Sequence, residues 1–178
     1  MFSVAEHMLS RPDWEFTIIT PCAGIPPDEA GAAKYRTLLA EHGEVCEATG
    51  WKQANGPFLD DVYGPDNLDG LGVWLCGGLQ PGRSDWYDEW WAPMGIHHPD
   101  HREVRRVAGR IGRPTARFLE YEELPYRVLY PPQGRGGLIG YDPSMLERKC
   151  ELCRMYASQI GPEIERCLYV PERLWGPR

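Results

Sequence analysis

The sequence predicts an α+β fold, or an α/β fold, with a mixed sheet of four to five strands and about three helices. Three observations predict it. Short β-branched and apolar runs alternate along the chain with longer segments whose apolar residues recur at helical spacing. That alternation favours helices packed on a sheet. The 178 residues also include 20 glycines and 17 prolines, which indicate long loops between short elements.

The clearest strand is residues 15–20, Glu-Phe-Thr-Ile-Ile-Thr, which are β-branched and apolar and lie between Asp13 and Pro21. A helix is expected over residues 28–42. Two prolines precede its first turn, acidic residues suit the positive end of the helix dipole, and Gly43 provides a stop.

The middle of the chain is expected to contain two short strands and two long loops. Residues 44–49 form a possible strand, and residues 72–76, Gly-Val-Trp-Leu-Cys, resemble a short buried strand. Residues 52–72 and 80–99 are rich in glycine, proline, aspartate or tryptophan, so long irregular loops are expected there.

The second half of the chain is expected to begin with a helix over residues 100–111. Its apolar residues at 104, 107, 108 and 111 follow the spacing of one helix face. Residues 117–121 and 126–130 are then predicted as strands that could pair as a hairpin. A long helix follows over residues 142–159 and a short one over 162–168, each with proline in its first turn.

The size favours one domain over residues 1–178, with a core at 15–130 and a helical extension at 131–178. The net charge of −7 disfavours a general nucleic-acid coat, because phosphate binding needs a basic surface. No apolar run is long enough to cross a membrane. The first residues do not form a secretory signal, so we expect a cytoplasmic protein whose six cysteines are mostly reduced.

Four segments share a rhythm with a known family: residues 16–20, 33–40, 73–77 and 107–118. In this respect the chain resembles a family of small bacterial domains that has no assigned function. That family has a Phe-Ile-Thr-Ala-type strand, a leucine-rich helix and a helix that ends in Arg-Phe-Gly-Gln. The resemblance covers about residues 15–120 and implies a compact α/β-type domain without a particular reaction.

Arginines concentrate on the expected helix 100–111 and reverse the sign of an otherwise acidic chain. Guanidinium groups match phosphate and carboxylate geometry, so this helix is a candidate anion site. The alternative is a solvated face whose arginines pair with neighbouring glutamates. The candidate ligand-binding residues on and just beyond this helix are Arg102, Arg106, Arg110 and Arg113.

The segment His97-His98-Pro99-Asp100-His101 is a weaker candidate for a metal site. Imidazole and carboxylate are ligands for Zn²⁺ and related ions. Cys150 and Cys153 have the spacing of half a zinc site, but they share a helical stripe with apolar residues and are better read as core thiols. The favoured interpretation is therefore no metal, with an exposed histidine loop.

Two further features could contribute to a site. The aromatic and acidic residues 85–91 include Trp86 and Trp90, which could stack on a ligand, anchor a loop or bind a partner. The loop after the first strand, with Thr20 and Cys22, leads into a helix start, a place that attracts anions.

The leading functional hypothesis is therefore a protein that binds a nucleotide or another phosphate-containing anion, with catalysis not established and the cofactor unknown. One alternative is a protein–protein interaction or inhibitor module, for example from a phage, anchored by exposed tryptophans. A second alternative is a metal- or thiol-dependent enzyme. The expected partner is thus an anionic small molecule or a protein.

Overall fold

The computed structural model describes residues 4–63, 70–77, 87–112, 117–130, 137–138 and 143–176, and its broad class is α+β, as predicted. Besides the 3₁₀ helix η1 (Asp61–Tyr63), the described helices are α1 (Ala5–Leu9), α2 (Glu29–Thr49), α3 (Leu71–Gly77), α4 (Pro99–Gly112), α5 (Tyr126–Leu129), α6 (Pro143–Arg154) and α7 (Pro162–Leu168). The strands are β1 (Thr17–Thr20), β2 (Lys52–Asn55), β3 (Glu89–Pro93), β4 (Arg117–Tyr121), β5 (Gly137–Leu138) and β6 (Arg173–Trp175).

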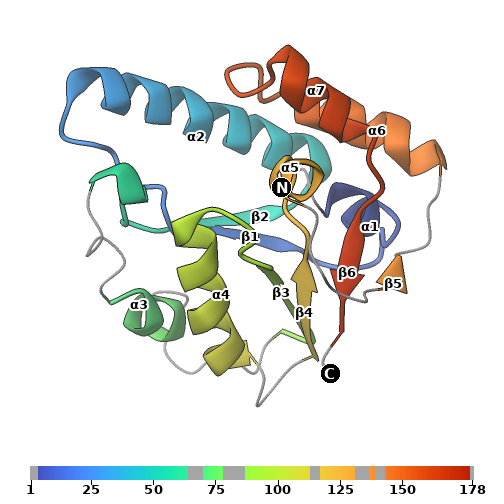
Figure 1. Cartoon of the computed structure of the whole chain (residues 1–178), viewed down its shortest axis with the longest axis horizontal. Coiled ribbons are helices and arrows are strands. Elements are labelled where there is room, and N and C mark those ends of the chain that lie inside the picture. The colour runs from blue at the N-terminus through green and yellow to red at the C-terminus, as the bar shows by residue number, and fades with distance from the viewer. Residues whose placement is uncertain are drawn as a thin grey trace.

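The strands form two sheets, where the sequence predicted one. β1 and β2 pair in parallel, and the second sheet has the order β3-β4-β6-β5. Within it β3 and β4 are parallel, whereas β6 is antiparallel to both β4 and β5. In Figure 1, α2, α6 and α7 run along the upper side of the strands, and α3 and α4 lie to the lower left. The helix α4 packs against both β3 and β4.

The predicted strand at 15–20 is confirmed by β1, but the strand predicted at 44–49 is wrong. These residues continue α2, which begins as predicted, with the Asp28 side chain accepting a hydrogen bond from the Gly31 amide at 2.7 Å. Val45 and Cys46 are buried on the helix, so packing carries it past Gly43. It ends at Gly50, whose φ of +73° is the left-handed conformation that closes many helices.

The strand predicted at 72–76 is also wrong, because this segment is the helix α3. Leu71 and Leu75 are buried against Val107 of α4, whereas Val73 is 78% exposed. Burial of residues four apart is the pattern of a helix face. A run of five apolar residues carries no period by which strand and helix can be told apart.

The hairpin predicted from residues 117–121 and 126–130 does not form. The first segment is β4, but the second forms the short helix α5. β4 pairs instead with β3, which lies within the loop predicted at 80–99, and with β6 near the carboxyl end of the chain. Both partners are distant in sequence, so local turn signals gave no indication of them.

Helix α4 has the apolar face that its spacing predicted, and α7 has the predicted bounds. The predicted helix at 142–159 is α6, which ends at Arg154. Residues 64–69 and 80–86, which belong to the two predicted long loops, lie outside the described residues. Within the part of the chain that is described, no helix combines the length and apolar character needed to cross a membrane.

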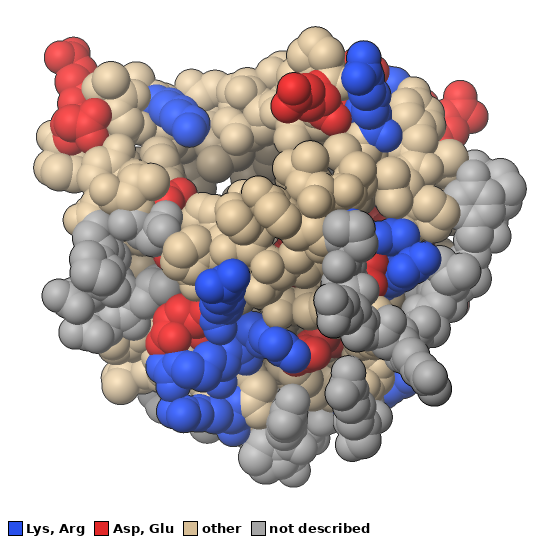
Figure 2. Space-filling model, in the orientation of Figure 1, with Lys and Arg blue, Asp and Glu red and all other residues tan. Residues whose placement is uncertain are grey.

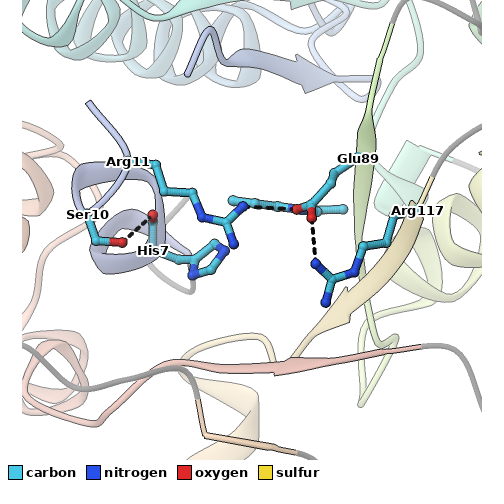
Figure 3. A network of polar contacts seen from close by, with 6 residues as sticks. His7, Ser10, Arg11, Glu89 and Arg117 are labelled. Carbon is cyan, nitrogen blue, oxygen red and sulfur yellow. Dashed lines mark hydrogen bonds and ion pairs between the residues drawn. The ribbon is translucent and has the colours of Figure 1, made fainter. Parts of the chain in front are cut away.

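A polar network joins α1 to the start of the parallel pair β3 and β4 (Figure 3). The Glu89 carboxylate accepts hydrogen bonds from Arg11 at 3.2 Å, from Arg117 at 2.8 Å and from the Trp91 indole at 3.0 Å. The His7 ring lies against Trp91, with ring centroids 4.7 Å apart. This network lies at the amino-terminal end of β3, because Glu89 is its first residue.

Candidate functional site

The candidate site lies beyond the carboxyl ends of the parallel strands. Three segments meet there: the one after β2 supplies Asp60, the one after β3 supplies residues 97–101, and the one after β4 supplies Glu123. In proteins with parallel strands, ligands bind preferentially at the carboxyl ends of those strands, because loops from several strands converge there.

Its centre is formed by Asp60, His98 and Asp100. One ligand atom from each side chain lies within 4.8 Å of the other two, and Asp100 is buried. Among the described residues, this is the only group of three or more His, Cys, Asp or Glu side chains that is compact enough to hold a metal ion. The tertiary fold thus joins two residues of the predicted segment to a carboxylate about forty positions earlier.

Helix α2 holds Asp60 in place through Tyr35. The buried Tyr35 hydroxyl donates a hydrogen bond to Asp60 Oδ2 at 2.8 Å. Burial, together with the nearby Asp60 carboxylate, raises the pKa of Tyr35 well above its usual range, so the hydroxyl stays protonated and remains a donor. This contact connects helix α2 to the site.

Glu123 organises the segment that contains the histidines. Its carboxylate Oε1 accepts hydrogen bonds from the backbone amides of Gly95 and Ile96, at 2.8 and 3.1 Å, and lies 3.2 Å from Nδ1 of His101. The Glu123 side chain is 2% exposed, whereas that of His101 is 37% exposed. The buried Glu123 carboxylate thus links the segment before α4 to the imidazole of His101 in the first turn of that helix.

Gly95 makes the turn between β3 and this segment possible. Its φ is +72°, and a β-carbon placed there would lie 2.9 Å from the Cα of Arg102. Only glycine adopts this conformation without strain and leaves this space. The turn brings the segment close against the first turn of α4.

Aromatic rings flank the cluster on the α5 side. His97 stacks on Tyr130 with ring centroids 4.3 Å apart and an interplanar angle of 9°. The ring of Tyr126 lies 5.7 to 6.1 Å from the rings of His97, His98 and His101. His97 therefore takes part in an aromatic wall and is not in the metal-binding group. Figure 2 shows that the surface is hollowed between α2 and the amino-terminal end of α4.

The arginines of α4 form the basic area at the lower left of Figure 2. Arg106 pairs with Glu103 on the same helix, and Arg105 makes a two-pronged contact with Glu120 of β4 at 2.7 and 2.9 Å. Arg102 follows the histidine segment and Arg110 lies in the last turn, while Arg113 lies outside the described residues. At Arg105 and Arg106, the structure thus has the paired, solvated face that was the alternative to an anion site.

The other candidate residues lie apart from the cluster or in the core. Thr20 ends β1, where its carbonyl accepts a hydrogen bond from the Gly56 amide at 2.9 Å. The backbone of Cys22 forms an isolated antiparallel β-bridge with Pro57. Trp90 is buried with Phe118 and Ala108, so it is not an exposed anchor. Trp86 lies outside the described residues.

The paired cysteines belong to the core of the α6–α7 region. Cys150 and Cys153 are buried with Leu168, and burial raises the pKa of Cys153 to about 12. A thiol in that state is a poor nucleophile and a poor metal ligand. The sequence reasoning placed these two residues correctly.

Sequence reasoning missed three residues of the site: Tyr35, Asp60 and Glu123. Tyr35 was expected only as part of the helix at 28–42. Asp60 lay in the long loop predicted at 52–72, and Glu123 lay between the strands predicted at 117–121 and 126–130. The order Glu-Glu directly after a strand was the one available signal for Glu123, because residues at strand ends often contribute to sites.

By sequence, the chain matches no family model and no curated protein. By structure it is similar to teicoplanin deacetylase Orf2 in a zinc-inhibited form, with a TM-score of 0.78, 16% identity, and coverage of 98% of this chain and 92% of that one. It is also similar to the A40926 pseudoaglycone deacetylase Dbv21, with a TM-score of 0.71, 17% identity, and coverage of 99% and 90%.

These matches correct two expectations from the sequence. The resemblance to a family of small domains without assigned function is wrong, because nearly the whole chain shares its fold with deacetylases. The expectation of a nucleotide- or phosphate-binding protein without established catalysis is wrong for the same reason, as is the alternative of a phage-type interaction or inhibitor module. The remaining alternative, a metal- or thiol-dependent enzyme, stays a prediction.

Proposed function

We propose that this protein is a hydrolase that removes an acyl group from an amide nitrogen, with a divalent metal ion held by Asp60, His98 and Asp100. The observation that carries the proposal is this cluster, in which two carboxylates and an imidazole meet at the carboxyl ends of the parallel strands. The fold shared with deacetylases supports the reaction type by analogy.

The three side chains fit a divalent metal ion. Ligand bonds of 2.0 to 2.2 Å place two donors of a tetrahedral ion about 3.3 to 3.6 Å apart. The three donor atoms here lie within 4.8 Å of one another, so side-chain movements of about 1 Å bring them to that range. A mixed set of oxygen and nitrogen donors suits zinc and its transition-metal neighbours.

A metal ion bound there would polarise the amide carbonyl and acidify a water molecule. In the reaction, the water oxygen bonds to the carbonyl carbon and the C–N bond breaks. One proton passes from the water to the departing nitrogen, so the products are a carboxylic acid and an amine. The imidazole of His101 is the side chain type that most often carries protons in such steps. Tyr35 and Glu123 hold Asp60 and His101 during the reaction.

The test combines metal analysis with product release. Untagged protein loaded with Zn²⁺, Co²⁺ or Mn²⁺ is incubated with a panel of N-acetylated amino sugars and N-acyl amino acids. Release of acid and of primary amine is measured. We expect equal amounts of the two products and about one bound metal ion per chain. A metal-loaded protein that hydrolyses no member of the panel would count against the proposal.

Variants locate the activity in the cluster. Asp60→Asn and His98→Ala are each expected to weaken metal binding and hydrolysis by at least about 100-fold, because removing a ligand exceeds the 10- to 100-fold loss typical of its outer partners. His97→Ala is the matched control, because its ring stacks on Tyr130 outside the cluster. Wild-type turnover in either cluster variant contradicts the assignment.

A further inference from the structure

We infer that Glu123 is a positioning residue that fixes the tautomer of His101, so that Nδ1 carries the proton and Nε2 carries the lone pair. The inference rests on the proposed function and adds to it a buried carboxylate that does not belong to the metal-binding group. Its basis is the contact of 3.2 Å between Glu123 Oε1 and His101 Nδ1.

The contact determines which nitrogen is protonated. An ionised carboxylate only accepts hydrogen bonds, so the imidazole nitrogen that faces it must carry the hydrogen. In a neutral ring the other nitrogen, Nε2, then has a free electron pair. An Nε2 in this state can bind a metal ion or accept a proton from water, whereas the opposite tautomer can do neither.

The position of Glu123 is itself fixed by the backbone. The amides of Gly95 and Ile96 donate to the same oxygen that faces His101, and 98% of the side chain is buried. A residue that was present only to balance charge would not need three donors directed at one oxygen.

The neighbouring glutamates provide an internal comparison. Glu120 is partly exposed and pairs with Arg105. Glu122 pairs with Arg127 and accepts a hydrogen bond from the Trp175 indole at 3.1 Å. These two glutamates therefore bind cations or a structural donor, whereas the Glu123 carboxylate contacts the imidazole of His101.

The inference is tested by nitrogen NMR of the imidazole rings, which separates the two tautomers by the ¹⁵N shifts and couplings of each ring. The spectrum is recorded on metal-free protein at pH 8.5, with His101→Gln used to assign the signals. We expect His101 in the Nδ1–H form in the wild type. A wild-type His101 in the Nε2–H form, or as an even mixture, overturns the inference.

Glu123→Ala is the diagnostic variant, because it removes the oxygen that faces Nδ1 of His101. We expect the His101 ring to lose its preference for Nδ1–H in this variant. Glu123→Gln should keep the preference, because its amide oxygen can accept from Gly95, Ile96 and His101. Glu120→Gln is the matched control and should not change the tautomer. A Glu123→Ala protein whose His101 stays in the Nδ1–H form contradicts the inference.

The tautomer result does not depend on turnover, so the two proposals can fail separately. An Nδ1–H form of His101 in a protein that hydrolyses no amide supports the positioning role and counts against the proposed reaction. Amide hydrolysis by a protein whose His101 is in the Nε2–H form supports the reaction and overturns the role of Glu123.

Discussion

Two clusters of ionisable side chains in this molecule are built in opposite ways. At the candidate site, Asp60 is held by a neutral hydroxyl and Glu123 by backbone amides, while the imidazole of His98 lies near two carboxylates. In the second cluster the ammonium group of Lys149 lies between two buried carboxylates. It is 2.7 Å from Glu6 and 3.4 Å from Glu172.

The difference separates structure from function. Lys149 of α6 is fully buried, and its charge offsets the carboxylates that come from α1 and from the segment after α7. It joins three parts of the chain. The site cluster gathers oxygen and nitrogen donors around positions that a cation can occupy. Buried carboxylates that a protein cation neutralises indicate a structural role. Carboxylates that gather around a position for a bound cation indicate a binding site.

The largest effect is expected from Lys149→Met. Removing the ammonium group leaves Glu6 and Glu172 buried without a cation, which destabilises proteins by about 3–5 kcal/mol. Urea unfolding measures the loss. Adding Glu172→Gln to the variant removes one of the stranded charges and should recover part of the stability. Equal stability of Lys149→Met and the wild type would show that the cluster is not a structural core.

The second prediction concerns the pH dependence of stability and uses two buried groups whose pKa values shift in opposite directions. Burial, with Arg11 nearby, lowers the pKa of His7 to about 4, whereas burial raises the pKa of Glu172 to about 7. Neither ring nitrogen of His7 has a hydrogen-bond partner among the described residues. The fold thus favours neutral His7, and this contribution to stability is lost as the pH falls from 6.5 to 4. It favours protonated Glu172, and that contribution is lost as the pH rises from 4.5 to 7.

A variant that lacks one of the two groups should therefore show the pH dependence of stability that the other group causes. Glu172→Gln should leave a protein whose stability falls with acid by as much as about 3 kcal/mol, which corresponds to the His7 shift. His7→Phe keeps a ring beside Trp91 and should give the reverse slope between pH 4.5 and 7 (Figure 3). The measurement is the unfolding free energy from pH 4 to 8. Identical slopes in the two variants contradict the assignment.

The third prediction addresses the backbone of the site. Gly95→Ala places a β-carbon against the Cα of Arg102 at a φ of +72°, with an expected cost of about 1–2 kcal/mol. Because Gly95 also donates to Glu123, the variant should weaken Zn²⁺ binding as well as stability. Gly161→Ala is the control, because nothing lies within 4 Å of a β-carbon there. Unchanged metal affinity would show that the turn at Gly95 does not support the metal-binding group.

The smallest effect is expected from the arginine face. Arg106→Ala removes an exposed pair with Glu103, and such pairs add little to stability. We expect no measurable change in the unfolding free energy or in amide hydrolysis. Loss of hydrolysis in this variant would show that Arg106 contributes to the site. The arginine face of α4 would then not be a merely solvated surface.

The sequence by itself determined the elements whose signals are local. Strand β1 and helices α4 and α7 follow from side-chain period and from prolines at helix starts, as does the beginning of α2 at Asp28. The sequence also placed Cys150 and Cys153 in the core. It offered residues 97–101 only as a weaker candidate for a metal site, and metal binding there stays a prediction. These features depend on neighbours within one or two turns of chain.

Only the tertiary structure decided the rest. Residues 44–49 and 72–76 became helical because Val45, Leu71 and Leu75 are buried by contacts with distant segments. Asp60 and Glu123 reached the histidines because parallel strands bring their carboxyl ends together, whatever their separation in sequence. Local propensity therefore set where several elements begin, whereas long-range burial and strand pairing determined which side chains form the site.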